Sequence, residues 1–179
     1  LEAYRALTDL KRKGVVAGVG IGAKDWRSIE KIAKDVSLDW VMIANSYTIY
    51  HHPKELVDFV ASLHQQNISV INSAVFHGGF LMGSDYFNYI QLDRNNPEHQ
   101  HYYHWRDKFN SLCAKYHIAP PAAAIYFGLH VPGVKSIALN SSNPKRVQHN
   151  IEMANAEIPA AFWQQMKEEQ LIDINYPHL

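Results

Sequence analysis

Residues 68–83, with the sequence ISVINSAVFHGGFLMG, contain the clearest signal for the fold of this chain. The stretch opens as a short apolar run rich in β-branched residues, which is typical of a strand buried on both faces. The run ends at His77-Gly78-Gly79, where the chain has to leave the sheet. Two consecutive glycines let backbone N–H groups approach a bulky or anionic ligand, but the same pair also occurs in plain turns. The stretch alone leaves both interpretations open.

The rest of the chain repeats an alternation of helices and strands around this stretch. Strands are predicted at residues 15–22, 39–45, 69–74 and 135–140, where apolar residues leave no polar face. Helices are predicted at residues 1–13, after Asp25, from Pro53, over 105–116, after Pro121, from Pro144 and from Pro159. Because strands follow helices at the roughly 25- to 30-residue spacing of right-handed crossovers, we expect a parallel sheet in one α/β domain.

Composition indicates an ordinary globular domain. The 179 residues include 17 basic and 17 acidic side chains, so no charge bias points to nucleic acid or to a membrane surface. The single cysteine, Cys113, excludes an internal disulfide framework, and its place on an apolar helix side predicts a buried thiol rather than a nucleophile. No apolar run reaches the roughly 20 residues of a membrane span, and a reducing cytoplasm is expected.

The chain opens without an initiator methionine and without the apolar core of a signal peptide. Leu1, Tyr4, Leu7 and Leu10 recur at helical spacing instead, and Gly14 stops the pattern. Because such an opening is typical of the middle of a helix, we expect the chain to belong to a larger protein.

Residues 84–103 break the alternation, because Tyr, Asn, Asp, His and Pro accumulate there without a period. An insertion of this size is typical of a lid or a substrate loop, and a poorly ordered spacer is the alternative. Its aromatic rings can cover the C–H surface of a sugar while Asn and His bond the hydroxyl groups. These aromatic residues are Tyr86, Phe87, Tyr89 and Tyr102. We expect residues 84–100 to be the most mobile part of the chain.

Polar and small residues gather at the carboxyl ends of the predicted strands, where parallel α/β folds bind their ligands. The first three ends are Gly22-Ala23-Lys24, Asn45-Ser46-Tyr47 and Phe76-His77-Gly78-Gly79. The fourth end, residues 140–143, also opens a helix whose first turn contains Lys145 and Arg146. Because helix N-termini favour anions, this end predicts a phosphate site, with simple caps and turns as the alternative.

Several better-known motifs are absent from the sequence. His99, His101 and His104 lie close together, but their spacing fits no helical zinc pair and no second cluster completes a ligand shell, so no metal site is expected. There is no Walker A sequence and no Gly-x-Ser-x-Gly elbow. Residues 19–23 lack the third glycine of a dinucleotide fingerprint.

Taken in order, residues 13–26, 39–53, 68–83 and 131–150 resemble the second half of an aldo/keto reductase. They are most similar to the branch of bacterial sugar dehydrogenases that act on L-fucose and related aldoses. The most specific piece is residues 141–150 (SSNPKRVQHN), which is similar to the family's adenosine-phosphate motif. The resemblance implies half of a (β/α)8 TIM barrel, with four parallel strands that match strands five to eight. The family's catalytic Asp, Tyr, Lys and His come from the first half and match nothing here, so the chain alone is expected to be inactive.

The same resemblance implies NAD or NADP as the cofactor. Phe76, His77, Gly78 and Gly79 would lie along the pyrophosphate, Ser141 and Arg146 would face the adenosine ribose or its phosphate, and Asn150 would reach the adenine. Asn72 falls where many members have an aromatic ring that stacks on the nicotinamide, and Asn140 falls where NADP-dependent relatives often have Lys. Because a 2′-phosphate normally needs several cations, Asn140 predicts a preference for NAD or tolerance of both.

The match departs from the family at the nicotinamide end. Gly22-Ala23-Lys24 replaces the usual Ser-Asn pair that holds the carboxamide, and Ala44 falls near the usual Gln. Two functions remain open: the cofactor-binding half of an oxidoreductase for an aldose or other small carbonyl compound, and a non-enzymatic half-barrel. Because a four-strand half leaves sheet edges and one face unburied, we expect self-association or pairing with the missing N-terminal half. A small-molecule substrate is expected in the intact protein, and neither nucleic acid nor membrane.

Overall fold

A computed structural model describes residues 2–179, and Leu1, the first residue of the helix expected over residues 1–13, lies outside this range. The elements, in chain order, are α1 (Glu2–Arg12), β1 (Gly20–Ala23), α2 (Trp26–Ala33), β2 (Trp40–Ala44), α3 (Lys54–Gln65), β3 (Ser69–Ser73), the 3-10 helix η1 (His77–Met82), β4 (Tyr86–Phe87), β5 (Ile90–Gln91), the 3-10 helix η2 (Pro97–His99), α4 (Gln100–Lys115), α5 (Pro120–Leu129), β6 (Val134–Ala138), α6 (Lys145–Ala154) and α7 (Ala160–Glu168). All predicted helices and strands are present, although several begin or end at other residues.

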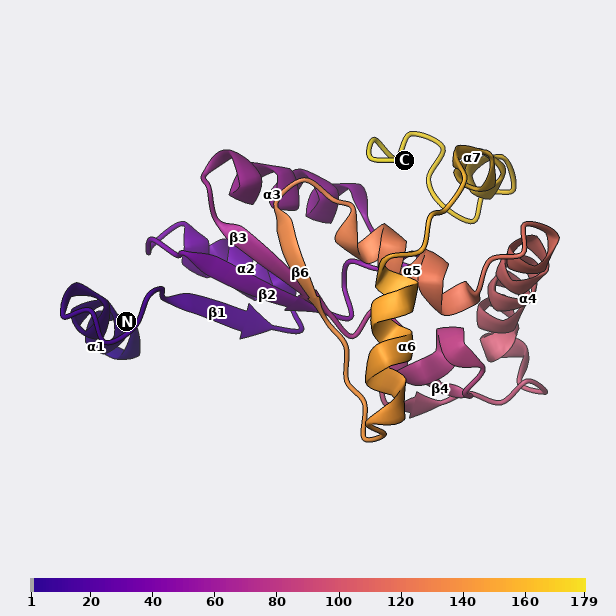
Figure 1. The fold of residues 1–179 in the computed structure, drawn as a ribbon, viewed down its shortest axis with the longest axis horizontal. Helices are drawn as coiled ribbons and strands as arrows, with labels where there is room; N and C mark the ends of the chain where they lie inside the picture. The colour runs from indigo at the N-terminus through magenta and orange to yellow at the C-terminus, as the bar shows by residue number, and fades with distance from the viewer. Residues whose placement is uncertain (1) are drawn as a thin grey trace.

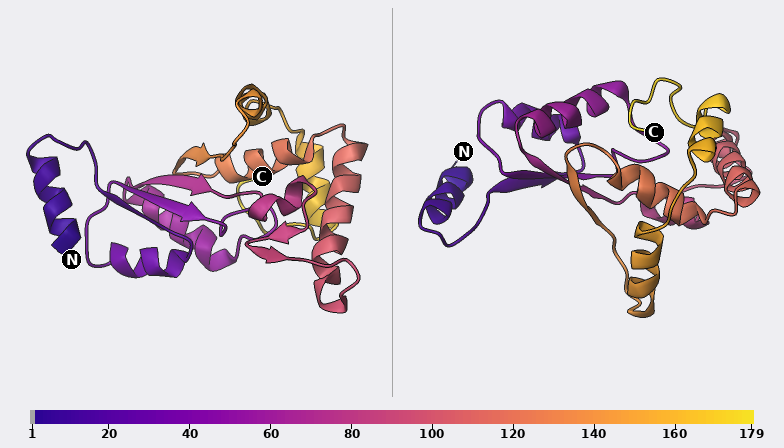
Figure 2. Two further views of the ribbon diagram at one scale, coloured as in Figure 1. Left: turned by 90° about the horizontal axis from the view of Figure 1, so that it is seen from below. Right: turned by 45° about the horizontal axis from the view of Figure 1, so that its top comes forward.

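Strands β1, β2, β3 and β6 form one parallel sheet in that order, which confirms the predicted α/β class (Figure 1). Because the strands are parallel, their carboxyl ends lie at one edge of the sheet. Helix α2 packs against β1 and β2, α3 against β3, and α5 against β6. Figure 2 shows α2 and α3 along the same side of the sheet. The carboxyl edge therefore bears the loops in which the ligand-binding residues are predicted.

The two faces of the sheet differ in burial, as β2 illustrates. Val41 and Ile43 are 0% exposed, because alternate residues of a strand share one face and this face packs against helices. Trp40 and Met42 lie on the other face and are only partly buried. Within residues 2–179 the sheet thus has one packed face and one partly open face.

The first strand is shorter than predicted. The prediction over residues 15–22 is wrong for residues 15–19, since β1 begins at Gly20 and Val15 is 66% exposed. The reason is that a strand needs a neighbour, and the pairing of β1 with β2 begins only at Gly20 and Trp40. Apolar composition alone therefore predicted too long a strand. The other three strands agree with their predictions to within two residues.

The segment after β3 forms small packed elements. Strands β4 and β5 pair as an antiparallel hairpin, and Phe87 and Leu92 are 9% and 5% exposed. Helix α4 begins at Gln100, not near Trp105 as predicted, so the irregular part ends at residue 99. The greater mobility expected for residues 84–100 stays a prediction.

Cys113 lies in the core of the protein and is 1% exposed, which confirms the predicted buried thiol. Burial raises the pKa of this thiol to about 12. A thiol with that pKa holds almost no thiolate at neutral pH and is therefore a poor nucleophile.

Helix α1 lies at one end of the molecule, apart from the main body (Figures 1 and 2). None of its residues is buried, and it is held by few contacts. The Tyr4 hydroxyl donates to the Ser37 carbonyl oxygen at 2.8 Å, and Lys11 pairs with Asp39 at 2.5 Å.

No helix in residues 2–179 is both long enough and apolar enough to cross a membrane.

Candidate functional site

A cavity at the carboxyl edge of the sheet has a volume of about 900 Å³ and lies between the turn after β3 and the start of α6. Seven of the nine residues predicted to hold a cofactor line it. They are Phe76, Gly78, Gly79, Asn140, Ser141, Arg146 and Asn150. Residues from two strand ends that are far apart in the sequence therefore meet at one cavity.

The turn after β3 has the backbone conformation that its glycines allow. His77, Gly78 and Gly79 have φ values of 50°, 70° and 97°, a left-handed run that favours glycine. A Cβ atom on Gly78 would lie 3.3 Å from the backbone nitrogen of Asn88, so a larger residue would also crowd the hairpin. The Gly79 N–H donates to the Phe76 carbonyl oxygen at 3.0 Å. The turn is therefore a compact wall of the cavity.

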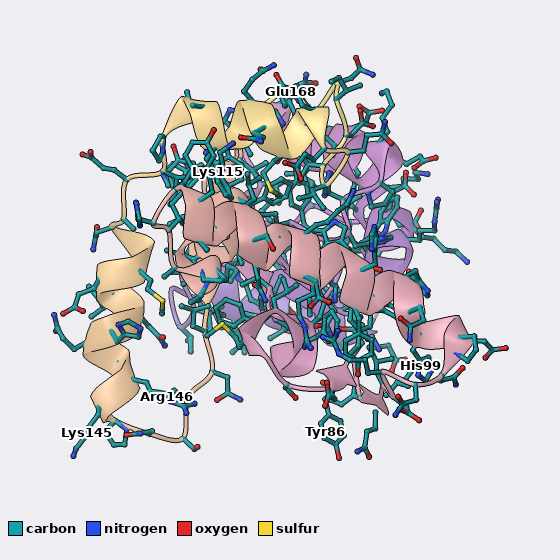
Figure 3. The ribbon with its side chains drawn as sticks, turned by 90° about the vertical axis from the view of Figure 1, so that its right-hand side faces the viewer. Tyr86, His99, Lys115, Lys145, Arg146 and Glu168 are labelled. Atoms are coloured by element: carbon teal, nitrogen blue, oxygen red, sulfur yellow. The ribbon has the colours of Figure 1, made fainter. Side chains whose placement is uncertain are left out.

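The other wall comes from the link between β6 and α6. Asn143 Oδ1 accepts from the Lys145 N–H at 3.0 Å, so Asn143 caps the first turn of α6. The Ser141 hydroxyl donates to the Asn143 carbonyl oxygen at 3.0 Å. Figure 3 shows Lys145 and Arg146 together at this end of α6. Both side chains are exposed, and Arg146 lines the cavity whereas Lys145 does not. Together with the N-terminal dipole of α6, Arg146 makes this wall favourable for an anion.

Asn72 does not lie at the cavity. Its side chain is 0% exposed, and its Nδ2 donates to the carbonyl oxygens of Tyr47 at 2.9 Å and of Gly128 at 3.0 Å. Asn72 thus belongs to the face that packs against helices, and its neighbour Ser73 lines the cavity instead. A shift of one residue along a strand turns a side chain to the opposite face. The predicted position, Asn72, is therefore one residue away from Ser73, the residue of this strand end that lines the cavity.

The His77 ring also points away from the cavity and into the core. It is 1% exposed and stacks on Phe87 with the ring centres 4.4 Å apart. Nδ1 lies 3.1 Å from Asn88 Oδ1, and Nε2 lies 2.6 Å from Thr48 Oγ1. Burial lowers the pKa of His77 to about 4, with a smaller contribution from nearby His51. The imidazole is therefore neutral at pH 7 and offers no positive charge to a phosphate.

Sequence reasoning missed several residues of the cavity. These include Ser73, Met82, Ser84, His149 and Met153. The helical spacing of α6 contained a usable signal, because residues three or four positions apart share one side of a helix. Arg146, His149, Asn150 and Met153 have this spacing, and all four line the cavity.

Within the described part of the chain, no three His, Cys, Asp or Glu side chains are arranged to hold a metal ion. His99, one of the clustered histidines, instead accepts a hydrogen bond at Nδ1 from the Asp93 N–H at 2.9 Å. The absence of a metal site stays a prediction.

Comparison with known proteins gives one family match and several relatives. The model of the aldo/keto reductase family matches residues 1–170. Pyridoxal 4-dehydrogenase from Microbacterium luteolum is 26% identical over an alignment of 178 positions, which covers 94% of this chain and 48% of the relative. D-threo-aldose 1-dehydrogenase from Pseudomonas sp is 28% identical over an alignment of 177 positions, which covers 95% of this chain and 51% of the relative. The chain thus spans about half the length of these relatives.

Two solved structures of aldo-keto reductase AKR11C1 from Bacillus halodurans share the fold. The apo form superposes with a TM-score of 0.70 at 21% identity, over 96% of this chain and 56% of the other. The holo form superposes with a TM-score of 0.67 at 19% identity, over 93% of this chain and 54% of the other.

Proposed function

Because this chain belongs to the aldo/keto reductase family, we propose that it is the C-terminal, cofactor-binding half of an NAD(P)-dependent oxidoreductase. Its substrate would be an aldose or another small carbonyl compound or alcohol. The observation that carries the proposal is the meeting of seven predicted cofactor residues at one cavity of about 900 Å³. A cavity of that size is in the range of small-molecule and cofactor sites.

The assignment to the second half of a barrel has two supports. The sheet contains four parallel strands, whereas a complete (β/α)8 barrel contains eight. The chain also spans 48% and 51% of the two dehydrogenases to which it is similar. We assign β1, β2, β3 and β6 to strands five to eight, because the adenosine-phosphate motif of the resemblance follows the last of them.

The residues present fit a dinucleotide. The pyrophosphate would lie along the turn from Phe76 to Gly79, and the adenosine phosphate would lie at the start of α6 near Ser141 and Arg146. Asn150, on the same side of α6 as Arg146, would contact the adenine. When bound, the nicotinamide would supply or accept a hydride. This chain would hold and orient the nucleotide, and the proton-transfer groups would come from the other half.

The substrate class is argued from the two relatives and from the residues beside the hairpin. One relative is named as a D-threo-aldose 1-dehydrogenase and another as a pyridoxal 4-dehydrogenase. We favour an aldose because the aromatic residues of the hairpin and α4 lie beside polar side chains at the same edge of the sheet.

A second candidate is a non-enzymatic half-barrel that associates with itself or with another chain. It is favoured by the open face of the sheet, where Trp40 and Met42 are only partly buried. Strands β1 and β6 each pair with one neighbour, so two sheet edges remain available among residues 2–179. In both candidates we propose an association into a dimer or larger species, or a pairing with a first half-barrel.

The cofactor assignment is tested by titrating the chain with NADH and NADPH and following nucleotide fluorescence. Arg146→Ala should weaken binding at least about tenfold, because it removes a charged hydrogen bond. Lys145→Ala is the matched control, since Lys145 is an adjacent exposed cation that does not line the cavity, and it should change affinity less than about threefold. Equal losses in the two variants would argue against a specific site.

The two candidates are separated by a nicotinamide-coupled aldose assay together with light scattering. We expect negligible turnover by the chain alone and a mass of a dimer or more. Robust turnover by a monomer would overturn the half-barrel assignment. Association without any nucleotide binding would favour the non-enzymatic candidate.

A further inference from the structure

A second, smaller cavity of about 270 Å³ lies under the β4–β5 hairpin, at the carboxyl end of β2. Aromatic rings form part of its wall: Phe87 and Tyr102 have ring centres 4.6 Å apart, and Tyr50 and Tyr102 have theirs 5.9 Å apart. The polar part of its lining includes Asn45, Ser46 and Asn88. Apolar faces beside amide groups are the combination that binds a sugar, whose C–H surface and hydroxyl groups alternate.

Asn45 is the feature that points to a ligand. It is 9% exposed, and its Oδ1 is buried and accepts no hydrogen bond from any residue in the described range. Buried polar atoms nearly always form hydrogen bonds, so an unpartnered amide in the wall of a cavity indicates that a ligand supplies the missing hydrogen bond. The amide can rotate about its last side-chain bond, which can present either its oxygen or its NH₂ group to a ligand.

Asn88, between β4 and β5, supplies the complementary group. Its Oδ1 accepts from His77 Nδ1 at 3.1 Å, which leaves the NH₂ group as the donor that Asn88 can offer. The backbone N–H of Asn88 also donates to the His77 carbonyl oxygen at 3.3 Å. His77 therefore acts as a positioning residue, because it fixes the hairpin and the orientation of the Asn88 amide.

The turn after β3 links the two cavities. Gly78 lines the larger cavity, and the ring of the preceding residue, His77, holds Asn88 at the smaller one. Residues 76–79 do not line the smaller cavity, so the turn is linked to that cavity through the hydrogen bond between His77 and Asn88.

We propose that the smaller cavity is a hydroxyl-binding subsite for an aldose, with the amides of Asn45 and Asn88 bonding sugar hydroxyls and Tyr102 covering the C–H surface. The proposal rests on the proposed oxidoreductase function for the class of ligand. The subsite itself is built entirely from this chain, so binding of the sugar does not depend on a first half-barrel.

The test is a ligand-observed NMR titration of the full 179-residue chain with L-fucose. Tetrahydropyran, which has the same ring without hydroxyl groups, is the comparison ligand. Asn45 has a φ of 57°, so Asn45→Gly removes the amide without straining the backbone. Asn67 has a φ of 59°, is exposed and lies outside this cavity, so Asn67→Gly is a matched control. Asn88→Asp keeps the acceptor for His77 and removes the NH₂ donor.

We expect the unmodified chain to bind L-fucose and to bind tetrahydropyran at least about tenfold more weakly. Asn45→Gly and Asn88→Asp should each raise the dissociation constant for L-fucose at least about fivefold, the effect of losing one hydrogen bond, and Asn67→Gly should leave it within twofold. No binding of L-fucose, equal binding by Asn45→Gly, or equal binding of tetrahydropyran would overturn the subsite. Tighter, Asn45-dependent binding of pyridoxal would overturn its assignment to a sugar.

The NADH titration with Arg146→Ala, run on the same samples, reports on the larger cavity alone. Loss of NADH binding with L-fucose binding intact would reject the cofactor proposal and keep the subsite. NADH binding without L-fucose binding would reject the subsite and keep the cofactor proposal.

Discussion

His77 Nδ1 donates a hydrogen bond to Asn88 Oδ1 at 3.1 Å and thereby joins the turn after β3 to the β4–β5 hairpin. The other ring nitrogen, Nε2, then accepts from the Thr48 hydroxyl at 2.6 Å, and that oxygen accepts from the His51 N–H at 3.0 Å. One neutral imidazole thus connects the loops that follow β2 and β3 with the hairpin. Because the ring accepts a hydrogen bond at Nε2, protonation at that atom would break this arrangement.

Stability should therefore fall on mild acidification. The pKa of His77 is about 4 in the folded protein and ordinarily 6.5, so the unfolded chain binds more protons between these values. The stabilisation is complete above pH 6.5 and is lost as the pH falls toward 4. From pH 7.5 to pH 5 the loss should be about 2 kcal/mol, at about 1.4 kcal/mol per pKa unit.

Urea denaturation at the two pH values measures this loss, and His77→Asn should reduce the pH dependence by most of that amount. The pKa values of His51 and His52 are also lowered by desolvation and contribute in the same direction, so the comparison has to be between variants. His117 is exposed and has a φ of 56°, close to the 50° of His77, which makes His117→Asn a matched control. An unchanged pH dependence in His77→Asn would contradict this account.

Gly20 should tolerate no side chain. A Cβ atom there would overlap the ring and the main-chain oxygen of Trp40, its partner in β2. Gly20→Ala should lower the free energy of unfolding by about 1 to 3 kcal/mol, the usual cost of overpacking. Gly22, in the same strand, would place its Cβ 3.4 Å from Met42 Cβ, an ordinary contact. Gly22→Ala should change the free energy by less than about 0.5 kcal/mol in the same denaturation experiment.

Replacing Asn72 should lower the free energy of unfolding more than replacing Ser73, because Asn72 is buried in the core and Ser73 lines the cavity. Asn72→Leu leaves the carbonyl oxygens of Tyr47 and Gly128 without their donor and should cost about 2 to 4 kcal/mol of unfolding free energy. Ser73→Ala removes one hydrogen bond of 3.2 Å to the Ile43 carbonyl oxygen and should cost about 1 kcal/mol or less. If Asn72→Leu were as stable as the parent and bound NADH more weakly, Asn72 would belong to the nucleotide site after all.

Asn140 should influence the choice between the two nucleotides. It lines the larger cavity and is exposed, so a lysine there can reach a 2′-phosphate. Asn140→Lys should shift the ratio of the NADPH and NADH dissociation constants toward NADPH by about tenfold, or about 1.4 kcal/mol. Asn110→Lys adds the same charge on the exposed side of α4 and should leave the ratio unchanged. A hundredfold preference of the unmodified protein for NADPH would mean that Arg146, with Lys145, suffices for the phosphate.

Local patterns in the sequence determined the class of fold and the order of its elements. Apolar β-branched runs and amphipathic segments alternate along the chain, and this alternation alone predicts parallel strands with their carboxyl ends at one edge. The glycine pair Gly78-Gly79 and the polar start of α6 marked the two loops that meet at the larger cavity. These features are local, because turn conformation and helix capping depend on residues that are close in the chain.

The tertiary structure decided which of those residues face the cavity. Asn72 and Ser73 are adjacent in the sequence, yet Asn72 is held in the core by the distant carbonyl oxygens of Tyr47 and Gly128, and Ser73 lines the cavity. His77 was predicted beside a phosphate, but its ring is held in the core by Thr48 and Asn88, which lie 29 and 11 residues away. The start of β1 at Gly20 was set by the first residue of β2. Each of these outcomes depends on which distant segments pack together, and a pattern along one stretch of chain does not contain that information.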